Sequence, residues 1–321
     1  MSHKFLHSVN IQERLISADG VQSYDLAVNP LSVLLLHLKP LNDTGTLSDF
    51  ATYLNVAGAI NRVAVLLNGV SVVSMTGRDA AAMAFFRHGI TPMQASHQDT
   101  NNFRRSLVLP ILMGSEIYSQ RSCFPATKRG ELILEVDFDI AATGYDGLRF
   151  AVETIELPGA KPKEYERKVQ LSGTFGATGI NDVELPLGNL NRGLLLFGTT
   201  AFTGASPAPT WGRVATYLDN EQHGYSAHDW EVAHMMSTLQ GGQPPSMDDH
   251  IHLTVASPPQ ETANHHEVGQ GGFENYAFLN FDPTGDDAYS LDASKSSRFH
   301  IEGNVETANA FRVVPVERVK V

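Results

Sequence analysis

Short runs in which apolar and polar residues alternate, separated by turn residues, make up most of the hydrophobic pattern of this 321-residue chain. The clearest run is Glu131–Ile140, in which Leu134, Val136 and Phe138 would share one face of a strand and the acidic residues the other. The strands expected from such runs cover residues 22–40 (two strands), 60–75 (two strands), 106–112, 131–140, 148–157 and 250–255. The pattern predicts a protein built mainly from β-strands.

The dipeptide Asn68-Gly69 predicts a tight hairpin between two of these strands, because a type I′ turn needs φ > 0 at both central residues. A helix is expected after the hairpin, reaching Phe86. A second short helix is expected over Thr46–Asn55, with Thr46 or Ser48 as its N-cap. Residues 91–103 are predicted to be a polar loop, and residues 1–20 a polar arm.

The second half of the chain repeats the first in the same order. Four blocks match: residues 62–69 with 213–220, 24–36 with 183–196, 126–133 with 293–300, and 150–152 with 311–313. The spacing drifts between blocks, as it does when two copies of one unit carry loops of different length. The order of the four matches predicts two tandem copies of one β-domain.

The stretch Leu157–Lys163 holds two prolines, a glycine and two lysines near the midpoint, and is the expected linker. We therefore divide the chain into an N-terminal arm (1–20), a first domain (21–160) and a second domain (161–321). Many short strands without a βαβ rhythm favour an all-β architecture. The expected fold is two tandem antiparallel eight-stranded jelly rolls, a double jelly roll with short helices in the loops.

Composition narrows the function classes. The formal net charge of −12 argues against a protein that binds nucleic acid directly. The single Cys123 excludes an internal disulfide, and no stretch has the roughly 20 apolar residues of a membrane-spanning helix. The first residues lack the apolar core of a signal peptide. We expect a protein that folds in the cytoplasm.

Two segments resemble a known family. Residues 63–69 (VAVLLNG) and 76–80 (TGRDA) resemble the strand, hairpin and helix of the first barrel in double-jelly-roll major capsid proteins of membrane-containing icosahedral bacteriophages and archaeal viruses. Residues 276–283 and 297–321 resemble the closing strands of the second barrel. The likeness covers most of residues 20–321. The insert at 240–272, rich in His, Pro and Gly, departs from the family pattern.

The resemblance implies a structural protein of the virion, folded in the host cytoplasm, with no catalytic residues, no cofactor and no metal. It implies homotrimers in which six barrels make a pseudo-hexameric tile of an icosahedral shell. Expected partners are further copies of the chain, minor capsid or vertex proteins, and an internal lipid membrane. The arm could touch that membrane through an amphipathic helix at residues 1–15 that carries Phe5, Leu6 and Ile11; a frayed terminus is the alternative.

The alternative function is a metal-dependent enzyme of the bicupin type, or another tandem-jelly-roll enzyme or sugar-binding protein. His250 and His252 would lie on one face of a strand at a spacing that metals accept. No carboxylate follows before Glu261, and the first half has no such pair, so a solvated or interface strand is favoured. His265 and His266 could complete this metal site only if the fold brought them to it, and adjacent residues on a strand point to opposite faces. Barrels filled with apolar side chains would favour the capsid hypothesis. A pocket around His250 and His252 would favour the enzyme hypothesis.

Other candidate sites have simpler interpretations. Asp282, Asp286 and Asp287 could hold calcium, but the spacing is that of an ordinary turn. Asp137 and Asp139 could be a glycosidase pair, but they continue a strand's outer face. Cys123, Trp211 and Trp230 are expected in the core or, for the tryptophans, at an interface. No nucleophile-elbow motif is present, and the glycines at 269–272 do not have the context of a phosphate loop.

Overall fold

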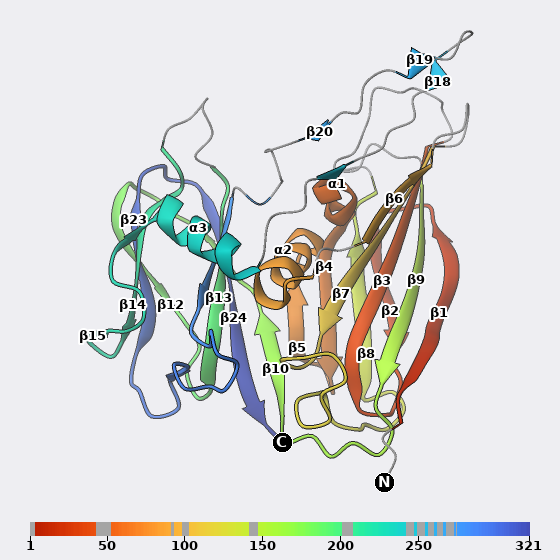
Figure 1. The fold of residues 1–321 in the computed structure, drawn as a ribbon, viewed down its shortest axis with the longest axis horizontal. Helices are drawn as coiled ribbons and strands as arrows, with labels where there is room; N and C mark the ends of the chain where they lie inside the picture. Colours follow the sequence, from red (N-terminus) through yellow and green to blue (C-terminus); the bar gives the residue numbers. More distant parts are fainter. Residues whose placement is uncertain are drawn as a thin grey trace.

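The computed structural model describes residues 4–42, 53–90, 93–97, 103–140, 147–200, 208–241, 273 and 275–321, and the residue pairs 247–248, 254–255, 260–261 and 266–267. These residues form two β-barrels that stand side by side (Figure 1). The helices of the described residues lie in the upper half of that view, and the C-terminus lies at the lower end.

The first barrel has two facing sheets whose strands are joined in jelly-roll order. One sheet runs β1 (Leu6–Ile16), β9 (Gly147–Glu156), β3 (Leu31–Asn42), β7 (Phe103–Leu112), β6 (Met93–His97). The other contributes β2 (Gly20–Asp25), β8 (Leu132–Phe138), β4 (Ile60–Leu67), β5 (Val70–Met75). Both sheets are antiparallel, and the chain crosses between them as in a jelly roll, with β6 as one additional edge strand.

The second barrel repeats this arrangement. One sheet contains β10 (Glu164–Val169) and β11 (Leu171–Thr174), both paired with β24 (Ala310–Lys320), followed by β13 (Leu190–Gly198) and β21 (Tyr276–Asn280), with β22 (Leu291–Asp292) on β13. The other runs β12 (Gly179–Glu184), β23 (Phe299–Val305), β14 (Trp211–Leu218), β15 (Glu221–Gln222), with β16 (His228–Asp229) on β14. The fold is a double jelly roll, as predicted.

Each of the four sequence repeats joins strands that hold the same place in the two barrels. The pairs are β4 with β14, β2 and β3 with β12 and β13, β8 with β23, and β9 with β24. Even the irregularities recur: β4 shifts register on β8 between Ile60 and Arg62, and β14 shifts on β23 between Trp211 and Arg213. The internal repeat is therefore confirmed at the level of individual strands.

The two barrels share a sheet. The edge strand β5 of the first barrel pairs in parallel with β10 of the second, through Val73 with Lys168 and Ser74 with Val169. A ten-stranded sheet therefore runs from β2 to β21 across both barrels. The boundary after residue 160 falls between β9 and β10 and stays a prediction, because hydrogen bonds cross it within one sheet.

Three helices lie within the described residues: α1 (Tyr53–Gly58), α2 (Gly77–His88) and α3 (Trp230–Gly241). The predicted helix after the hairpin is α2; the Thr76 hydroxyl accepts a hydrogen bond from the Asp79 amide at its start, and Gly89 ends it with φ 62°. The hairpin itself is confirmed, with φ 49° at Asn68 and 83° at Gly69. The expected helix over 46–55 overlaps α1 only from Tyr53, since residues 43–52 lie outside the described chain.

Two predictions of irregular structure are wrong. Residues 6–16 form β1, which pairs with β9 along its length, so neither a free arm nor an amphipathic helix occupies them. Within the expected loop 91–103, residues 93–97 form β6, paired with β7. Of the expected strand His250–Val255, the structure describes only β18 (Thr254–Val255), which pairs with β19 (Gln260–Glu261); β17 (Met247–Asp248) pairs with β20 (His266–Glu267).

Apolar side chains fill both barrels. The first core includes Leu34, Leu36, Leu134 and Phe150, and the second is built around Trp211. Leu132, Val136 and Phe138 of β8 are buried as predicted, and the acidic residues between them point outward. Within the described residues, no helix is long and apolar enough to cross a membrane.

Candidate functional site at the junction of the two barrels

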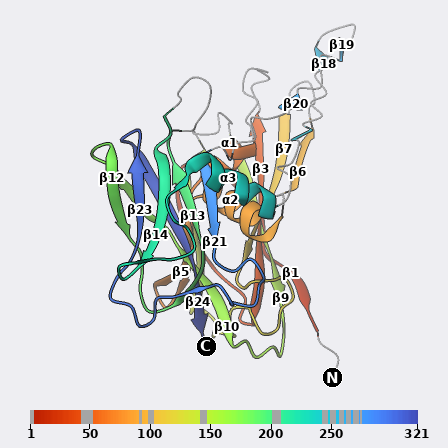
Figure 2. The ribbon, with the colours of Figure 1, turned by 60° about the vertical axis from the view of Figure 1, so that its left-hand side comes forward.

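The barrels meet where α2 lies beside the sheet of the second barrel (Figure 2). The side chains of greatest interest come from the elements on both sides of this junction. The strand β10 turns Glu164, Glu166 and Lys168 inward on one face, and all three are buried. Burial of charges is costly unless each is paired, so their partners decide whether this junction is stable.

Glu166 is the centre of a charge network that joins both barrels. Its Oε2 lies 2.8 Å from Nζ of Lys168, and its Oε1 lies 3.3 Å from Nη2 of Arg87, on α2, and 3.4 Å from Nη1 of Arg192, on β13. Lys168 also donates to the carbonyl oxygen of Leu112, on β7, at 2.8 Å. One carboxylate therefore ties the helix of the first barrel to the sheet of the second.

Arg192 extends the network toward the end of the chain. Its Nη2 lies 2.8 Å from Oε1 of Glu164, and its Nε donates to Oδ1 of Asp287 at 2.7 Å. Asp287 also accepts from Nη1 of Arg318, on β24. Acidic and basic groups thus alternate through the junction, which is the arrangement that offsets the desolvation of each.

The electrostatics favour the ionised forms of the acids. Burial alone would raise the pKa of Glu166, but the neighbouring Lys168 and Arg87 outweigh it and hold that pKa well below its usual range. Burial would likewise raise the pKa of Asp287, and its bonds to Arg192 and Arg318 lower it instead. The network is therefore an ion cluster rather than a set of groups prepared to exchange protons.

His88, the last residue of α2, is partly buried beside this cluster, and its Nε2 is out of contact with solvent. Burial lowers its pKa to about 3, with Lys168 and Arg87 acting in the same direction and Glu166 opposing them. The imidazole is therefore neutral at pH 7. A base with so low a pKa is poorly matched to proton transfer near neutrality.

A second polar contact crosses the junction at the start of α2. The Asp79 carboxylate accepts two hydrogen bonds from Arg312, on β24, both 2.8 Å long, and one from the hydroxyl of Tyr276, on β21, at 2.9 Å. The Arg312 guanidinium also lies 3.6 Å from the centre of the Phe197 ring. Burial raises the pKa of Tyr276 well above its ordinary value, so the phenol stays a donor.

Of the carboxylates considered for calcium, Asp282 and Asp287 belong to this junction, and Asp286 belongs to its own turn. Asp282 accepts from the amide of Asp287, and Asp286 accepts from the Thr284 hydroxyl and the Ala288 amide, as expected of a turn. Asp287 binds two arginines. No group of three metal-ligand side chains is found in the part of the chain that the structure describes.

The other candidates from the sequence include residues that the structure does not describe. His250, His252 and His265 lie outside the described residues, and His266 and Glu267 are described only as part of β20. Asp137 lies on the outer face of β8, as predicted.

Single residues follow their simpler interpretations. Cys123 is buried, and burial raises the pKa of its thiol to about 11. Trp211 and Trp230 are core residues.

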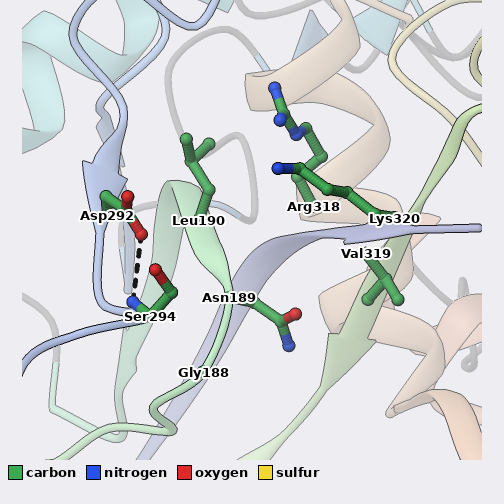
Figure 3. A pocket seen from close by; sticks show the side chains of 8 residues that line it. All are labelled: Gly188, Asn189, Leu190, Asp292, Ser294, Arg318, Val319 and Lys320. Atoms are coloured by element: carbon green, nitrogen blue, oxygen red, sulfur yellow. Dashed lines mark hydrogen bonds between the residues drawn. The ribbon is translucent and has the colours of Figure 1, made fainter.

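A pocket of about 320 Å³ lies at the edge of the junction (Figure 3). It is lined by Gly188, Asn189, Leu190, Asp292, Ser294, Arg318, Val319 and Lys320. Most of its polar groups already have partners: Asn189 donates to Glu317, Arg318 binds Asp287, and Asp292 accepts from the Ser294 amide. The pocket presents no pair of groups arranged as nucleophile and base.

Sequence analysis did not predict this ion cluster. Its members come from α2, β10, β13, β24 and the loop after β21, and each is an ordinary charged residue within its own segment. The only local signal is the run Glu164–Lys168, in which charged residues occupy every second position of a strand whose alternate face is half-buried. Such a run normally indicates a solvated face.

No protein-family model and no curated protein sequence matches the chain. Its structure is similar to the major capsid protein P2 of bacteriophage PM2, with a TM-score of 0.61 at 13% identity, covering 100% of this chain and 98% of that one. It is also similar to the capsid protein in the atomic structure of Sulfolobus turreted icosahedral virus (TM-score 0.71, 10% identity, 99% and 91% coverage) and to that of the PBCV-1 virus capsid (0.60, 11%, 99% and 94%). At such identities the likeness establishes the fold.

Proposed function

We propose that this chain is a viral major capsid protein that self-assembles as pseudo-hexameric homotrimers into an icosahedral shell, without catalytic activity. The observation that carries the proposal is the extent of the likeness: both barrels, in the same order, match capsid proteins over nearly the whole length of either chain. A fold alone does not fix a function, so the site has to agree with it.

The junction agrees with a structural role. A shared sheet, an ion cluster and the contact of Asp79 with Arg312 hold the two barrels as one rigid unit. A tile must keep a fixed shape to pack in a closed shell, and symmetric self-association needs no other ligand. Apolar side chains fill both barrels, which supports this function over a bicupin-type enzyme, since such an enzyme needs a polar cavity inside a barrel.

The proposal includes the virion as the location, after folding in the host cytoplasm, and minor capsid or vertex proteins and an internal lipid membrane as further partners. Any contact with that membrane cannot use an amphipathic helix over residues 1–15, because β1 occupies Leu6–Ile16. Direct binding of nucleic acid is not part of the proposal, in keeping with the net charge of −12.

The test is the mass of the purified protein by light scattering, with negative-stain images of the same sample. A species at three times 34.9 kDa that shows hexagonal outlines or shells is the expected result. A monomer at every concentration, without assemblies, would overturn the proposal and direct attention to metal analysis of the 250–266 segment.

A further inference from the structure

The helix α3 presents apolar side chains on two opposite faces. Trp230 and Ala233 face its own barrel and are buried. The opposite face carries Val232, Met235, Met236 and Leu239, whose exposed fractions are 46%, 58%, 42% and 70%. These four residues, here called the α3 stripe, follow the spacing of one helical face. A helix that is apolar on both sides is normally buried on both sides.

The equivalent helix of the first barrel shows what covers such a face. When α2 and α3 are aligned on their first residues, the counterparts of the α3 stripe are Asp79, Ala82, Met83 and Phe86, and all four are buried. The second barrel covers the two ends of this face, at Asp79 and Phe86. The Phe86 ring lies 5.6 Å from that of Phe273 and 6.3 Å from that of His234, on α3, while Asp79 binds Tyr276 and Arg312.

The surface of the second barrel that receives Asp79 is a row across three strands. Tyr276 on β21 and Arg312 on β24 both pair with Phe197 on β13. The counterparts of these strands in the first barrel are β7, β9 and β3. There His37 on β3 pairs with Val108 on β7 and with Ala151 on β9.

The row Val108, His37 and Ala151 is half-buried and alternates with residues of the first core, so it faces outward from that barrel. Half-buried Leu35 lies in the next row of the same face, as Leu195 does in the second barrel. Leu195 is buried under the first barrel, whereas Leu35 is partly open. The first barrel thus has a receiving face like that of the second, and among the described residues no helix of this chain's second barrel lies upon it.

The residue types change together on the two uncovered faces. On α3, Val232 replaces Asp79; on the outer row, Val108 replaces Tyr276 and Ala151 replaces Arg312. A carboxylate and its two donors are thus exchanged for three apolar groups. Phe197 at the centre of the row is exchanged for His37, whose Nε2 lies 2.5 Å from the Ser106 hydroxyl. If α3 packed on the row that holds Tyr276 and Arg312, those donors would be buried without Asp79. If α2 packed on the row that holds Val108 and Ala151, the Asp79 carboxylate would be buried without donors. At these positions α3 and the row of Val108 and Ala151 are both apolar, so they can pack on each other.

We infer that the α3 stripe of one copy packs on the outer face of β3, β7 and β9 of a second copy, so that the junction within the chain is repeated between chains. This inference rests on the proposed function and names the surfaces through which the copies meet. The interface continues the one already present, since α3 contacts α2 with its inner side. It joins two different surfaces, so it is heterologous and closes into a ring when the rotation permits.

Cross-linking tests the geometry. The double variant Ala151→Cys/Val232→Cys, treated with a short thiol-reactive cross-linker, is expected to run as a covalent trimer in denaturing gels, while each single variant stays monomeric. Self-linking of a single variant would instead indicate a two-fold, isologous contact and overturn the inference. The wild type is the background control, because its only cysteine, Cys123, is buried.

A charge tests the energetics. Leu239→Asp places a carboxylate in the inferred interface and is expected to raise the concentration needed for trimers by roughly 100-fold or more. Ile180→Asp is the matched control, because Ile180 is 73% exposed on β12, away from both faces. Circular dichroism should show both variants folded, since the replaced side chains are largely exposed.

The outcomes separate this inference from the proposed function. Trimers of the wild type that Leu239→Asp leaves intact, without cross-links in the double variant, would overturn the inference and keep the capsid proposal. A wild type that stays monomeric at every concentration would overturn both. Loss of trimers in Leu239→Asp but not in Ile180→Asp, with covalent trimers in the double variant, supports the inference.

Discussion

The carboxylate of Asp79 and the guanidinium of Arg312 form a bidentate ion pair between the barrels. Both hydrogen bonds are 2.8 Å long, and the two residues are 233 positions apart in the sequence. Asp79 is buried, and its side chain is 1% exposed. The pair therefore holds the two barrels together at this point, and the free energy lost when it is broken can be measured.

Replacing Arg312 with Met should lower the free energy of unfolding by about 3–5 kcal/mol, because it leaves the Asp79 carboxylate buried without its counter-charge. Chemical denaturation is the measurement. Arg213→Met is the matched control: its pair with Asp229 is equally short, at 2.7 Å, but 60% and 55% exposed, so a loss below about 1 kcal/mol is expected. Equal losses in the two variants would contradict the assignment.

Replacing Gly69 with Val should destabilise the fold by about 1 kcal/mol or more, because Gly69 has φ 83° and a β-branched residue resists that region. A Cβ at this position would meet nothing within 4 Å, so the effect is one of backbone strain alone. Gly69→Asn should cost less, since Asn tolerates positive φ. The midpoint of thermal unfolding measures both variants, and an unchanged midpoint for Val would place the strain elsewhere.

The pH dependence of stability should carry the signature of His88. Its pKa is about 3 in the folded protein and 6.5 ordinarily, so the unfolded state binds the extra proton and stability falls as the pH drops from about 6.5 toward 3. The full effect is on the order of 5 kcal/mol. Between about pH 6.5 and 4.5 the loss of stability comes from His88. The acids Glu166 and Asp287 have lowered pKa values, so their protonation destabilises the fold only below about pH 4.5.

The test for His88 is the slope of unfolding free energy against pH between 6.5 and 4.5, not the stability itself. His88→Phe should flatten this slope even if it lowers stability at every pH. His223→Gln, at an exposed position away from the junction, is the control variant. An unchanged slope in His88→Phe would show that another group takes up the proton.

Replacing Gly303 with Ala should cost about 1–3 kcal/mol, because the new methyl group would lie 2.6 Å from Cζ3 of Trp211. Trp211 is fully buried and its Nε1 donates to the carbonyl of Phe197, so the ring has little room to shift. A change in tryptophan fluorescence should accompany the loss. Gly176→Ala, where a Cβ meets nothing within 4 Å, should change neither.

Strand β1 shows why part of the fold escaped prediction. Its two buried residues, Ile11 and Ile16, are five positions apart, an odd spacing that a regular strand would place on opposite faces. A register shift on β9 between Ile11 and Arg14 brings them to the same side, and a second shift lies just before it, between Val9 and Ile11. The bulges break the period of two on which sequence prediction depends. Strand β6 was not predicted; it is a short edge strand that, among the described strands, pairs with β7.

The sequence by itself determined the β architecture, the hairpin at Asn68 and Gly69, and the presence of two copies of one unit, because alternation and turn chemistry are local and survive in each copy. Only the tertiary structure decided which charges are buried and paired, such as Glu166 with Arg87 and Arg192. Only the tertiary structure shows that a face of α2 is buried while the equivalent face of α3 is exposed. Those properties depend on how distant segments dock, and a charge or a methionine looks the same in sequence whether its partner is water, its own barrel or another chain.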